Sequence, residues 1–256
     1  MTRRALNLMA ALAALGASVV PAAGAHAADV KVLTSVALKS ALDELAPAFE
    51  KATGNKVTIG YDLAAEQKKR ILAGETADVI MLTRAMMEDV QKQSKLAGDL
   101  VNVAGTPVAL AARAGAPKPD IGTVDALKKT LLAARSIVYA DPAKGGLSGV
   151  VFARALDRLG IAEQMKPKTI LVPGAQSADL VAKGEAELGV GQASEIVPVA
   201  GVQLVGPLPG ELASMTLFTA AVGQGSKAPD AAKAFIEFLT GTQAAPRFKA
   251  MGFQPG

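Results

Sequence analysis

The run Val30-Lys31-Val32-Leu33 is short and rich in β-branched residues, and it predicts the first strand of an α/β fold. A helical pattern follows from about Ala37 to Thr53 and ends at Gly54, a residue type that often terminates helices. The apolar residues of this helix recur on one face, which should pack against a sheet: Leu38, Leu42, Leu45 and Phe49.

The same alternation of strand and helix continues beyond this first pair. Residues 56–61 predict a second strand, and a helix over about 66–73 stops at Gly74. Residues 78–82 predict a buried strand, because four apolar residues follow Asp78, and a helix over about 84–93 comes next. This β-α-β-α-β-α order indicates a mainly parallel sheet.

A second α/β set follows a break in the pattern. Residues 106–112 predict a strand that leaves the first unit, Pro117 and Pro119 mark a connector, and Thr123 should cap the next helix. Later elements are expected as helices over 124–134, 148–159, 178–186 and 229–239, and as strands over 136–140, 169–172, 188–192, 202–205 and 215–222.

The order of elements predicts two lobes. We expect residues 28–112 and 198–256 to build lobe 1 and residues 113–197 to build lobe 2, because the first and last thirds flank a self-contained middle third. The chain contains no internal repeat that would indicate a solenoid.

The N-terminal segment has the pattern of a secretory signal. Met1-Thr2-Arg3-Arg4 supplies a basic start, Ala5 to Val20 is almost free of charge, and Ala25-His26-Ala27 is a small-x-small cleavage site. The apolar part is too short for a comfortable bilayer span. We therefore expect residues 1–27 to be removed, leaving a soluble periplasmic protein; an uncleaved anchor is the alternative.

Composition excludes several kinds of chemistry. His26 is the single histidine, and Cys and Trp are absent, so the mature chain has no imidazole base, thiolate or zinc site with nitrogen or sulfur ligands. No metal or other cofactor is expected. The net charge is +4 and aromatic residues make up 4%, which argues against nucleic-acid binding. A monomer is expected.

Four segments lie where an open parallel sheet binds ligands, beyond the strand ends where helices begin. They are Thr34–Ala37, Asp62–Ala65, Asp141–Gly149 and Gly174–Ser177. Residues on these and neighbouring strand ends should line one crevice: Ser35, the 62–65 loop, Thr83, Ser148, Ser177 and Gln192. Ionisable groups nearby are Asp62, Glu66, Lys68, Arg84, Asp141 and Lys144. Ordinary helix capping is the alternative for any single loop.

Several segments together resemble one family. They are the strand-loop-helix of residues 32–38, Arg70 to Val79, Asp141-Pro142 with its Gly-rich turn, Glu187 to Val190, and the end from Gln243 through Phe253. With these, the chain resembles the periplasmic molybdate-binding family of type II solute-binding proteins, the soluble receptors of ABC importers. The resemblance implies two α/β lobes, each a mainly parallel sheet flanked by helices, joined by two crossover strands. It also implies a small anion as ligand and an ABC permease as partner.

The family holds its oxyanion with hydroxyls and backbone N–H groups, and several of these positions differ here. The first-loop serine falls on Ala37, and the second-loop serines fall on Leu63, Ala64 and Ala65. The backbone donors fall on Ser148 and about Ser177, and the ligand tyrosine falls on Gln192. The missing hydroxyls predict a carboxylate-bearing or other organic anion in preference to molybdate. Arg84 and Lys144 are the cations expected to meet it.

A second resemblance points to an enzyme. Leu45 to Glu50 and Gly206 to Pro209 are similar to a branch that includes a periplasmic aconitate isomerase. Such an enzyme would interconvert cis- and trans-aconitate by allylic proton transfer, with Lys144, Glu66, Asp62 or Asp141 as the base. A binding protein needs only a closable cleft with donors, and it is the preferred function. A secreted structural module is disfavoured by the absence of repeats.

Overall fold

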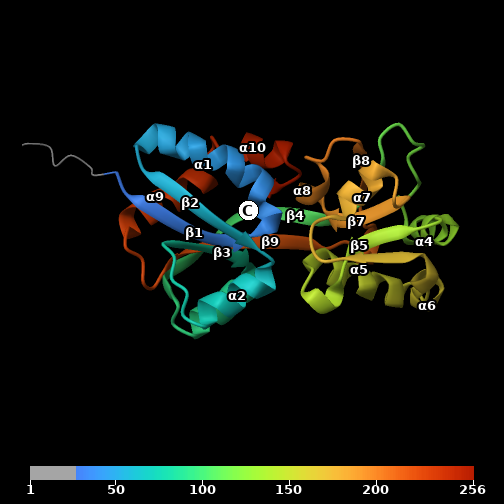
Figure 1. Cartoon of the computed structure of the whole chain (residues 1–256), viewed down its shortest axis with the longest axis horizontal. Helices are drawn as coiled ribbons and strands as arrows, with labels where there is room; N and C mark the ends of the chain where they lie inside the picture. The colour runs from blue at the N-terminus through green and yellow to red at the C-terminus, as the bar shows by residue number, and fades with distance from the viewer. Residues whose placement is uncertain (1–26) are drawn as a thin grey trace, which may run out of the picture.

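The structure, a computed structural model, describes residues 27–256, so the expected signal peptide lies, apart from Ala27, outside the described residues. Its strands form one hydrogen-bonded path in the order β2-β1-β3-β9-β4-β7-β5-β6, and β8 and β10 also pair with β4. Two groups of helices and strands lie along this path (Figure 1). They are called the first and second lobe below.

The first lobe combines the beginning and the end of the chain. It contains β1 (Asp29–Ser35), η1 (Val36–Leu38), α1 (Lys39–Thr53), β2 (Lys56–Asp62), α2 (Ala64–Leu72), β3 (Val79–Thr83), α3 (Arg84–Lys92), β9 (Met215–Gly223), α9 (Pro229–Thr240), α10 (Ala245–Ala250) and β10 (Gln254–Pro255).

The second lobe is formed by the middle of the chain. It contains α4 (Val124–Ala133), β5 (Ile137–Ala140), η2 (Pro142–Lys144), α5 (Leu147–Arg158), α6 (Ala162–Met165), η3 (Lys166–Lys168), β6 (Thr169–Val172), α7 (Ser177–Lys183), β7 (Leu188–Gln192), α8 (Ala193–Ile196), β8 (Val202–Pro207) and η4 (Gly210–Leu212). The lobe boundaries expected at residues 112/113 and 197/198 stay predictions; β8 and η4, which were expected in lobe 1, are grouped here with the second lobe because Val205 and Leu212 are buried in its core.

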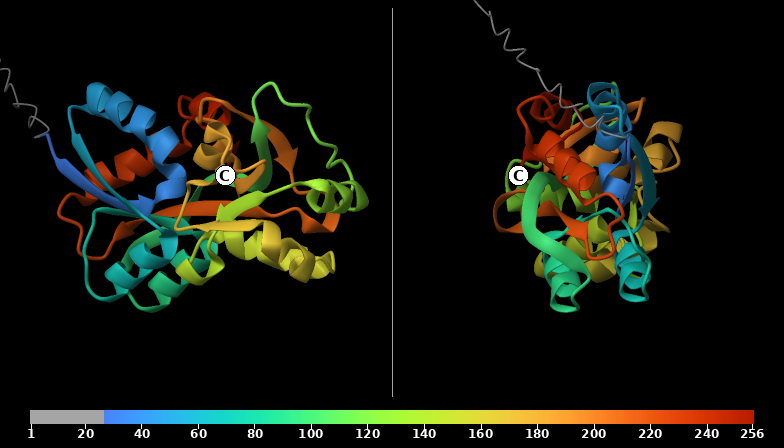
Figure 2. Two further views of the ribbon diagram at one scale, coloured as in Figure 1. Left: turned by 45° about the vertical axis from the view of Figure 1, so that its right-hand side comes forward. Right: turned by 90° about the vertical axis from the view of Figure 1, so that its left-hand side faces the viewer.

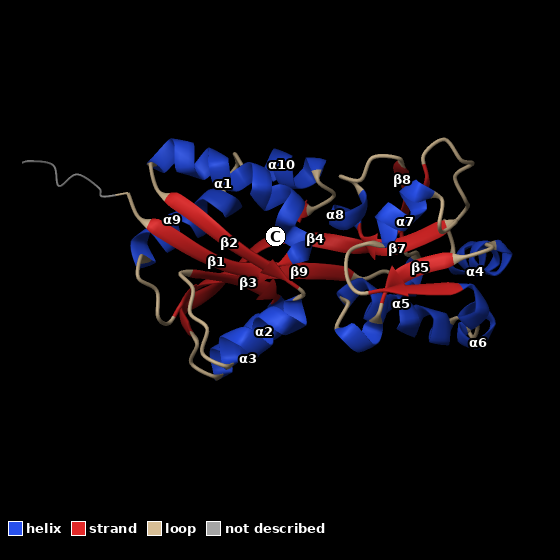
Figure 3. Ribbon diagram, in the orientation of Figure 1, coloured by secondary structure: helices blue, strands red, loops and turns tan. Residues whose placement is uncertain are grey.

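Helices cover both faces of the first-lobe sheet (Figure 3). On one face, Phe49 of α1 and Phe235 of α9 pack with Val30 and Val32 of β1 in one buried cluster. On the other face, α2 and α3 pack against β1 and β3. The alternation along β1 explains this arrangement, because Val32 and its neighbour Leu33 point to opposite faces.

The second lobe is layered in the same way. Leu127 of α4 and Phe152 of α5 are buried with Ile137 and Tyr139 of β5 on one face. Val138, which points to the other face of β5, packs with Val181 of α7. The two lobes therefore have separate hydrophobic cores, as an α/β protein of two lobes requires.

One strand crosses from the first lobe into the second. β4 (Leu96–Arg113) is 18 residues long. Its first half pairs with β9 and its second half pairs with β7 and β8, all antiparallel. Figure 2 shows that the molecule is long in the direction joining the lobes and compact when viewed along it. The chain thus crosses out on β4 and returns through β8 and β9.

The expectation of mainly parallel sheets holds for the outer strands of each lobe. β1 pairs parallel with β2 and β3, and β5 pairs parallel with β6 and β7. The strands around β4 are antiparallel, because the chain passes between the two lobes in both directions. This arrangement brings the carboxyl ends of β1 and β5 toward each other.

Candidate functional site

A cavity of about 20 Å³ lies between the two lobes, where β1 and β5 end. The first lobe lines it with Ser35, Val36, Leu63 and Ala64, and the second lobe with Ala140, Gly145, Gly146, Leu147, Ser148, Gly174, Ala175 and Glu195. A space of this size holds about one water molecule. The lobes must therefore move apart before a larger ligand enters.

The first-lobe wall is made by the starts of two helices. Ser35 ends β1 and is buried, and its Oγ accepts a hydrogen bond from the Ala37 backbone N–H at 3.3 Å. Leu63 precedes α2, and Ala64 is the first residue of that helix. The first-turn N–H groups of a helix have no intrahelical acceptors, so this wall carries partial positive charge.

The second-lobe wall is the turn between β5 and α5. Asp141 Oδ1 accepts from the Ala143 N–H at 2.9 Å, and Gly145 takes a φ of 78°, which together fold the turn tightly. A Cβ on Gly149 would come within 1.7 Å of the Ala140 carbonyl oxygen, so α5 can begin here only with glycine at this position. The turn therefore holds Ser148 at the cavity.

Glu195 is the titratable side chain of the described cavity lining. It lies in α8, directly behind β7, and its Oε2 accepts a hydrogen bond from the Gln192 backbone N–H at 3.1 Å. The residue is half-buried. Burial raises the pKa of Glu195 to about 7, and the Gln192 N–H offsets only part of this effect.

Hydrogen bonds and close contacts across the junction hold the two lobes together. Ser194 of α8 donates from Oγ to the Ala37 carbonyl at 3.0 Å, and Ser40 Oγ donates to the Ser194 carbonyl at 3.2 Å. A Cβ on Gly145 would lie 3.0 Å from the Ala65 Cβ, so the cavity rims also touch. α8 therefore lies where the lobes meet, with Glu195 beside that junction.

The structure brings together part of the predicted site. Ser35, Ala64 and Ser148 line the cavity. Ala37 is buried one turn behind Ser35, and Ala65 touches the opposite lobe at the rim. These residues come from both lobes, as the two-lobe prediction requires.

Other predicted site residues do not line the cavity. Thr83 caps α3 by accepting from the Met86 N–H at 3.4 Å. Ser177 and Gln192 are buried, and Gln192 Nε2 donates to Thr216 Oγ1 at 2.8 Å. Gln192 thereby ties β7 to β9, the returning strand. Their expected contact with a ligand stays a prediction.

The predicted charged residues also lie outside the cavity lining. Arg84 donates to Glu88 Oε1 at 2.9 Å, and Lys69 donates to Glu66 Oε1 at 2.7 Å. Asp62 accepts from the Leu63 N–H at 2.7 Å and pairs with Arg70, while Asp141 caps the η2 turn. Lys144 is exposed and makes no ion pair within residues 27–256. Their roles as ligand or base stay predictions.

Glu195 was missed by the sequence analysis. The rule that placed four loops at the ends of strands applies equally to the residues after β7, since Ala193-Ser194-Glu195 follow Gln192 directly. No helix is predicted after Gln192 because the four residues of α8 are too few to show a helical pattern.

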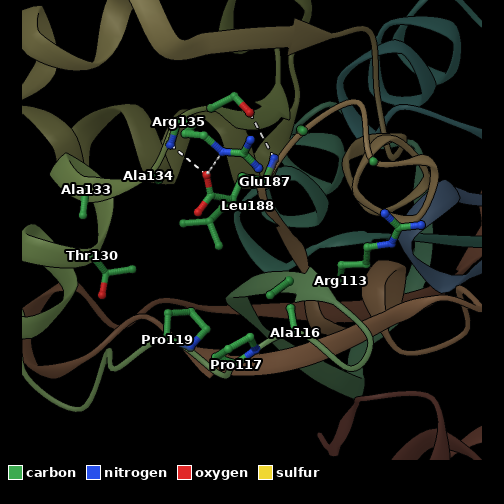
Figure 4. Close-up of a pocket in the computed structure, with 14 residues that line it drawn as sticks. Arg113, Ala116, Pro117, Pro119, Thr130, Ala133, Ala134, Arg135, Glu187 and Leu188 are labelled. Carbon is green, nitrogen blue, oxygen red and sulfur yellow. Dashed lines mark hydrogen bonds and ion pairs between the residues drawn. The ribbon is translucent and has the colours of Figure 1, made fainter.

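A larger cavity lies elsewhere. It has a volume of about 620 Å³ and is lined by the end of α4 and the residues before β5 and β7, at the opposite end of the second lobe. Figure 4 shows Arg135 paired with Glu187 at its wall, with Nε and Oε2 3.1 Å apart, and Arg113 on the other side. The carboxyl ends of the strands, where ligands are expected, point away from it.

Residues 27–256 contain neither a metal-binding cluster nor a membrane-spanning helix. No cluster of three or more His, Cys, Asp or Glu residues there could hold a metal ion. No helix in the same range is long and apolar enough to cross a bilayer. The candidate site is therefore built from helix starts, two serine hydroxyls and one carboxyl group.

Comparison with known proteins gives consistent matches over nearly the whole chain. The family model described as bacterial extracellular solute-binding protein matches residues 30–254. An aconitate isomerase from Pseudomonas sp is 35% identical over 231 residues, covering 88% of this chain and 87% of that protein. The molybdate-binding protein ModA of Escherichia coli K12 is 28% identical over 258 residues and covers 99% of each chain.

Solved structures show the same architecture. The periplasmic molybdate-binding protein of Azotobacter vinelandii matches with a TM-score of 0.72 at 20% identity, covering 89% of this chain and 99% of that one. This likeness confirms the expected fold, the two α/β lobes of type II periplasmic binding proteins.

Proposed function

Because the chain belongs to the bacterial extracellular solute-binding proteins, we propose that it captures a small organic anion in the cavity between its lobes. The observation that carries this proposal is the meeting of two helix starts from opposite lobes, α2 and α5, at one cavity. Their first-turn N–H groups favour a negatively charged ligand. After removal of residues 1–27, the protein acts as a periplasmic monomer and delivers its ligand to an ABC permease.

A carboxylate suits this cavity better than molybdate. Ser35 and Ser148 supply hydroxyls to the described lining, while Ala64 and the buried Ala37 stand where the molybdate-binding family has serines. Each lost donor to a charged acceptor weakens binding by about 1.5–3 kcal/mol. The small alanine side chains also leave room for a bulkier ligand when the lobes separate.

Lys144 is the cation proposed to meet the ligand. It lies in η2, immediately before Gly145 of the cavity wall, and its ammonium group has no partner in the described part of the chain. A charge-assisted hydrogen bond from it to a carboxylate is worth about 1.5–3 kcal/mol. Arg84 is the second proposed cation, although it already pairs with Glu88.

A second candidate function is isomerisation of aconitate on the same scaffold. It is favoured by the 35% identity to an aconitate isomerase and by a carboxyl group, Glu195, at the cavity. The reaction removes a proton from the methylene carbon next to the double bond and returns a proton at the far alkene carbon, so no other reactant is consumed. The enzyme would need a base whose pKa lies near neutral pH.

Calorimetry of residues 28–256 tests these proposals. We expect trans-aconitate, cis-aconitate or citrate to bind with micromolar or tighter affinity, about −8 kcal/mol or better, and molybdate, tungstate and sulfate to give no heat. Tight molybdate binding without any response to carboxylates would refute the organic-anion proposal. NMR spectra of cis-aconitate incubated with the protein show whether the trans isomer forms.

The variant Lys144→Ala separates the two functions. Loss of affinity without any turnover in the wild-type protein supports a receptor. Loss of turnover with binding largely retained makes Lys144 a base and supports an isomerase. Lys129→Ala is the matched control, because Lys129 is exposed on α4, far from the cavity lining.

A further inference from the structure

We propose that Glu195 holds a proton which it donates to a carboxylate of the bound ligand, so that ligand capture takes up a proton. This inference rests on the proposed function, because it assumes an anionic ligand in the cavity between the lobes. It adds a residue that selects the ligand class: acids whose carboxylate can accept a hydrogen bond from a neutral carboxyl group.

The two oxygens of Glu195 have different surroundings. Oε2 accepts from the Gln192 backbone N–H at 3.1 Å and so is fixed as an acceptor. Within residues 27–256, no hydrogen bond reaches Oε1. A proton on Oε1 would turn this oxygen into a donor without disturbing the bond to Gln192, and Glu195 is a residue of the cavity lining.

The backbone leaves space for the carboxyl group at this place. A Cβ on Gly191 would lie at an ordinary contact distance of 3.4 Å from Glu195 Oε2 and at a tight 3.1 Å from Ser177 Oγ, so the carboxyl group packs directly against the end of β7. The carboxyl group thus folds back along the strand end to accept from the Gln192 backbone N–H. Its position is set by the strand end rather than by a flexible loop.

No cation faces Glu195 among the described residues. The elements packed around the cavity are η1, α2, the turn before α5 and the 174–175 turn, and they present Ser35, Leu63, Ala64, Gly146, Ser148 and Ala175. The charged residues on and beside these elements are Asp62 at the end of β2, Asp141 and Lys144 of the turn, and four residues of α2, and none of them lines the cavity: Glu66, Lys68, Lys69 and Arg70. No charged side chain of the cavity lining would therefore offset the repulsion between an ionised Glu195 and an anionic ligand.

Two carboxylates in one enclosed site share a proton, because their mutual repulsion opposes ionisation of both. The free protein is already prepared for this exchange, since burial raises the pKa of Glu195 to about 7. A bound anion raises the pKa of Glu195 further. Above neutral pH, Glu195 is mostly ionised in the free protein and protonated in the complex, so binding of the ligand must take up a proton.

The experiment is calorimetry of residues 28–256 with trans-aconitate between pH 6 and pH 9, in pairs of buffers with different ionisation enthalpies. Above pH 7 the affinity of the wild-type protein should fall by up to about tenfold for each pH unit. Proton uptake should approach one per ligand near pH 8. Glu195→Gln should bind with little pH dependence and near-zero uptake, because its amide copies the protonated acid: the oxygen accepts from Gln192 and the NH2 donates.

Glu163→Gln is the matched control, since Glu163 is exposed on α6 of the same lobe and should leave the pH slope and the uptake unchanged. If Glu195→Gln keeps the slope and uptake of the wild-type protein, this inference is wrong while the proposed function stands. If neither trans-aconitate nor citrate binds the wild-type protein at any pH, the proposed function fails and this inference fails with it. Circular dichroism of the variant establishes that it is folded before either result is read.

Discussion

Replacing Gly149 by alanine tests how the second-lobe wall is built. The new Cβ would lie 1.7 Å from the Ala140 carbonyl oxygen and 2.7 Å from its carbon, so α5 must retreat by roughly 1.5–2 Å to reach ordinary van der Waals separation. Retreat would pull Phe152 and Leu156, both buried, away from the core of the lobe. This overpacking, together with the void that the retreat of α5 leaves in the core, should lower the free energy of unfolding by about 3 kcal/mol or more.

Urea unfolding followed by circular dichroism measures this change. Gly122→Ala is the matched control: the nearest atom to its new Cβ is an Asp120 oxygen at an ordinary 3.4 Å, so its stability should change by less than about 1 kcal/mol. Gly149→Ala should also abolish ligand binding, because Ser148 moves with α5. A Gly149→Ala protein as stable as the control would refute the close approach of α5 to β5 on which the cavity depends.

Three further predictions concern single side chains. Asp78→Asn should cost about 3 kcal/mol in urea unfolding, because a donor replaces an oxygen that accepts hydrogen bonds, while exposed Asp99→Asn should change little. Burial raises the pKa of Asp78 but its hydrogen bonds lower it more, so the stabilisation that Asp78 provides should be complete near neutral pH and lost as the pH falls below about 4. A difference in free energy of unfolding between wild type and Asp78→Asn that does not change with pH would contradict this. Ser35→Ala and Ser148→Ala should each weaken trans-aconitate binding about tenfold or more in calorimetry, and unchanged affinity would place the ligand elsewhere. Phe49→Ala should lower stability by about 3–5 kcal/mol, because this buried ring contacts two rings of α9 with centroids 5.0 and 5.6 Å away; a loss below 1 kcal/mol would refute that packing.

Strong local signals in the sequence predicted most elements correctly. Gly54 ends α1 in the left-handed region with a φ of 78°, and Thr123 caps α4 by accepting from the Ala126 N–H at 3.1 Å. The beginning of β4 was missed, because Gly98, Asp99 and Asn102 interrupt any strand pattern there. Its pairing with β9 stabilises this stretch, and such long-range contacts cannot be read from local composition.

The candidate cavity lies at the strand ends where a ligand is expected, and only part of the expected set of residues lines it. The strand-end rule placed Ser35 and Ser148 at one cavity, because it depends on topology alone. Which side chains face that cavity depends on helix rotation and on competing hydrogen bonds, as with Gln192, whose amide turns to Thr216 instead. Glu195 was unforeseen because its burial comes from both lobes closing around it.

The pairing of β9 with both β3 and β4 has a consequence for the order of folding. An inner strand of the first-lobe sheet, between β3 and β4, is supplied by residues 215–223, and Ser226 in the loop after it donates to Asp78 across 148 residues of sequence. A growing or translocating chain therefore cannot finish its N-terminal sheet until its C-terminal quarter has emerged. The second lobe has nearby partners for β5, β6 and β7 and can form earlier, so the protein should assemble from its middle outward, with β9 as the slow, final pairing.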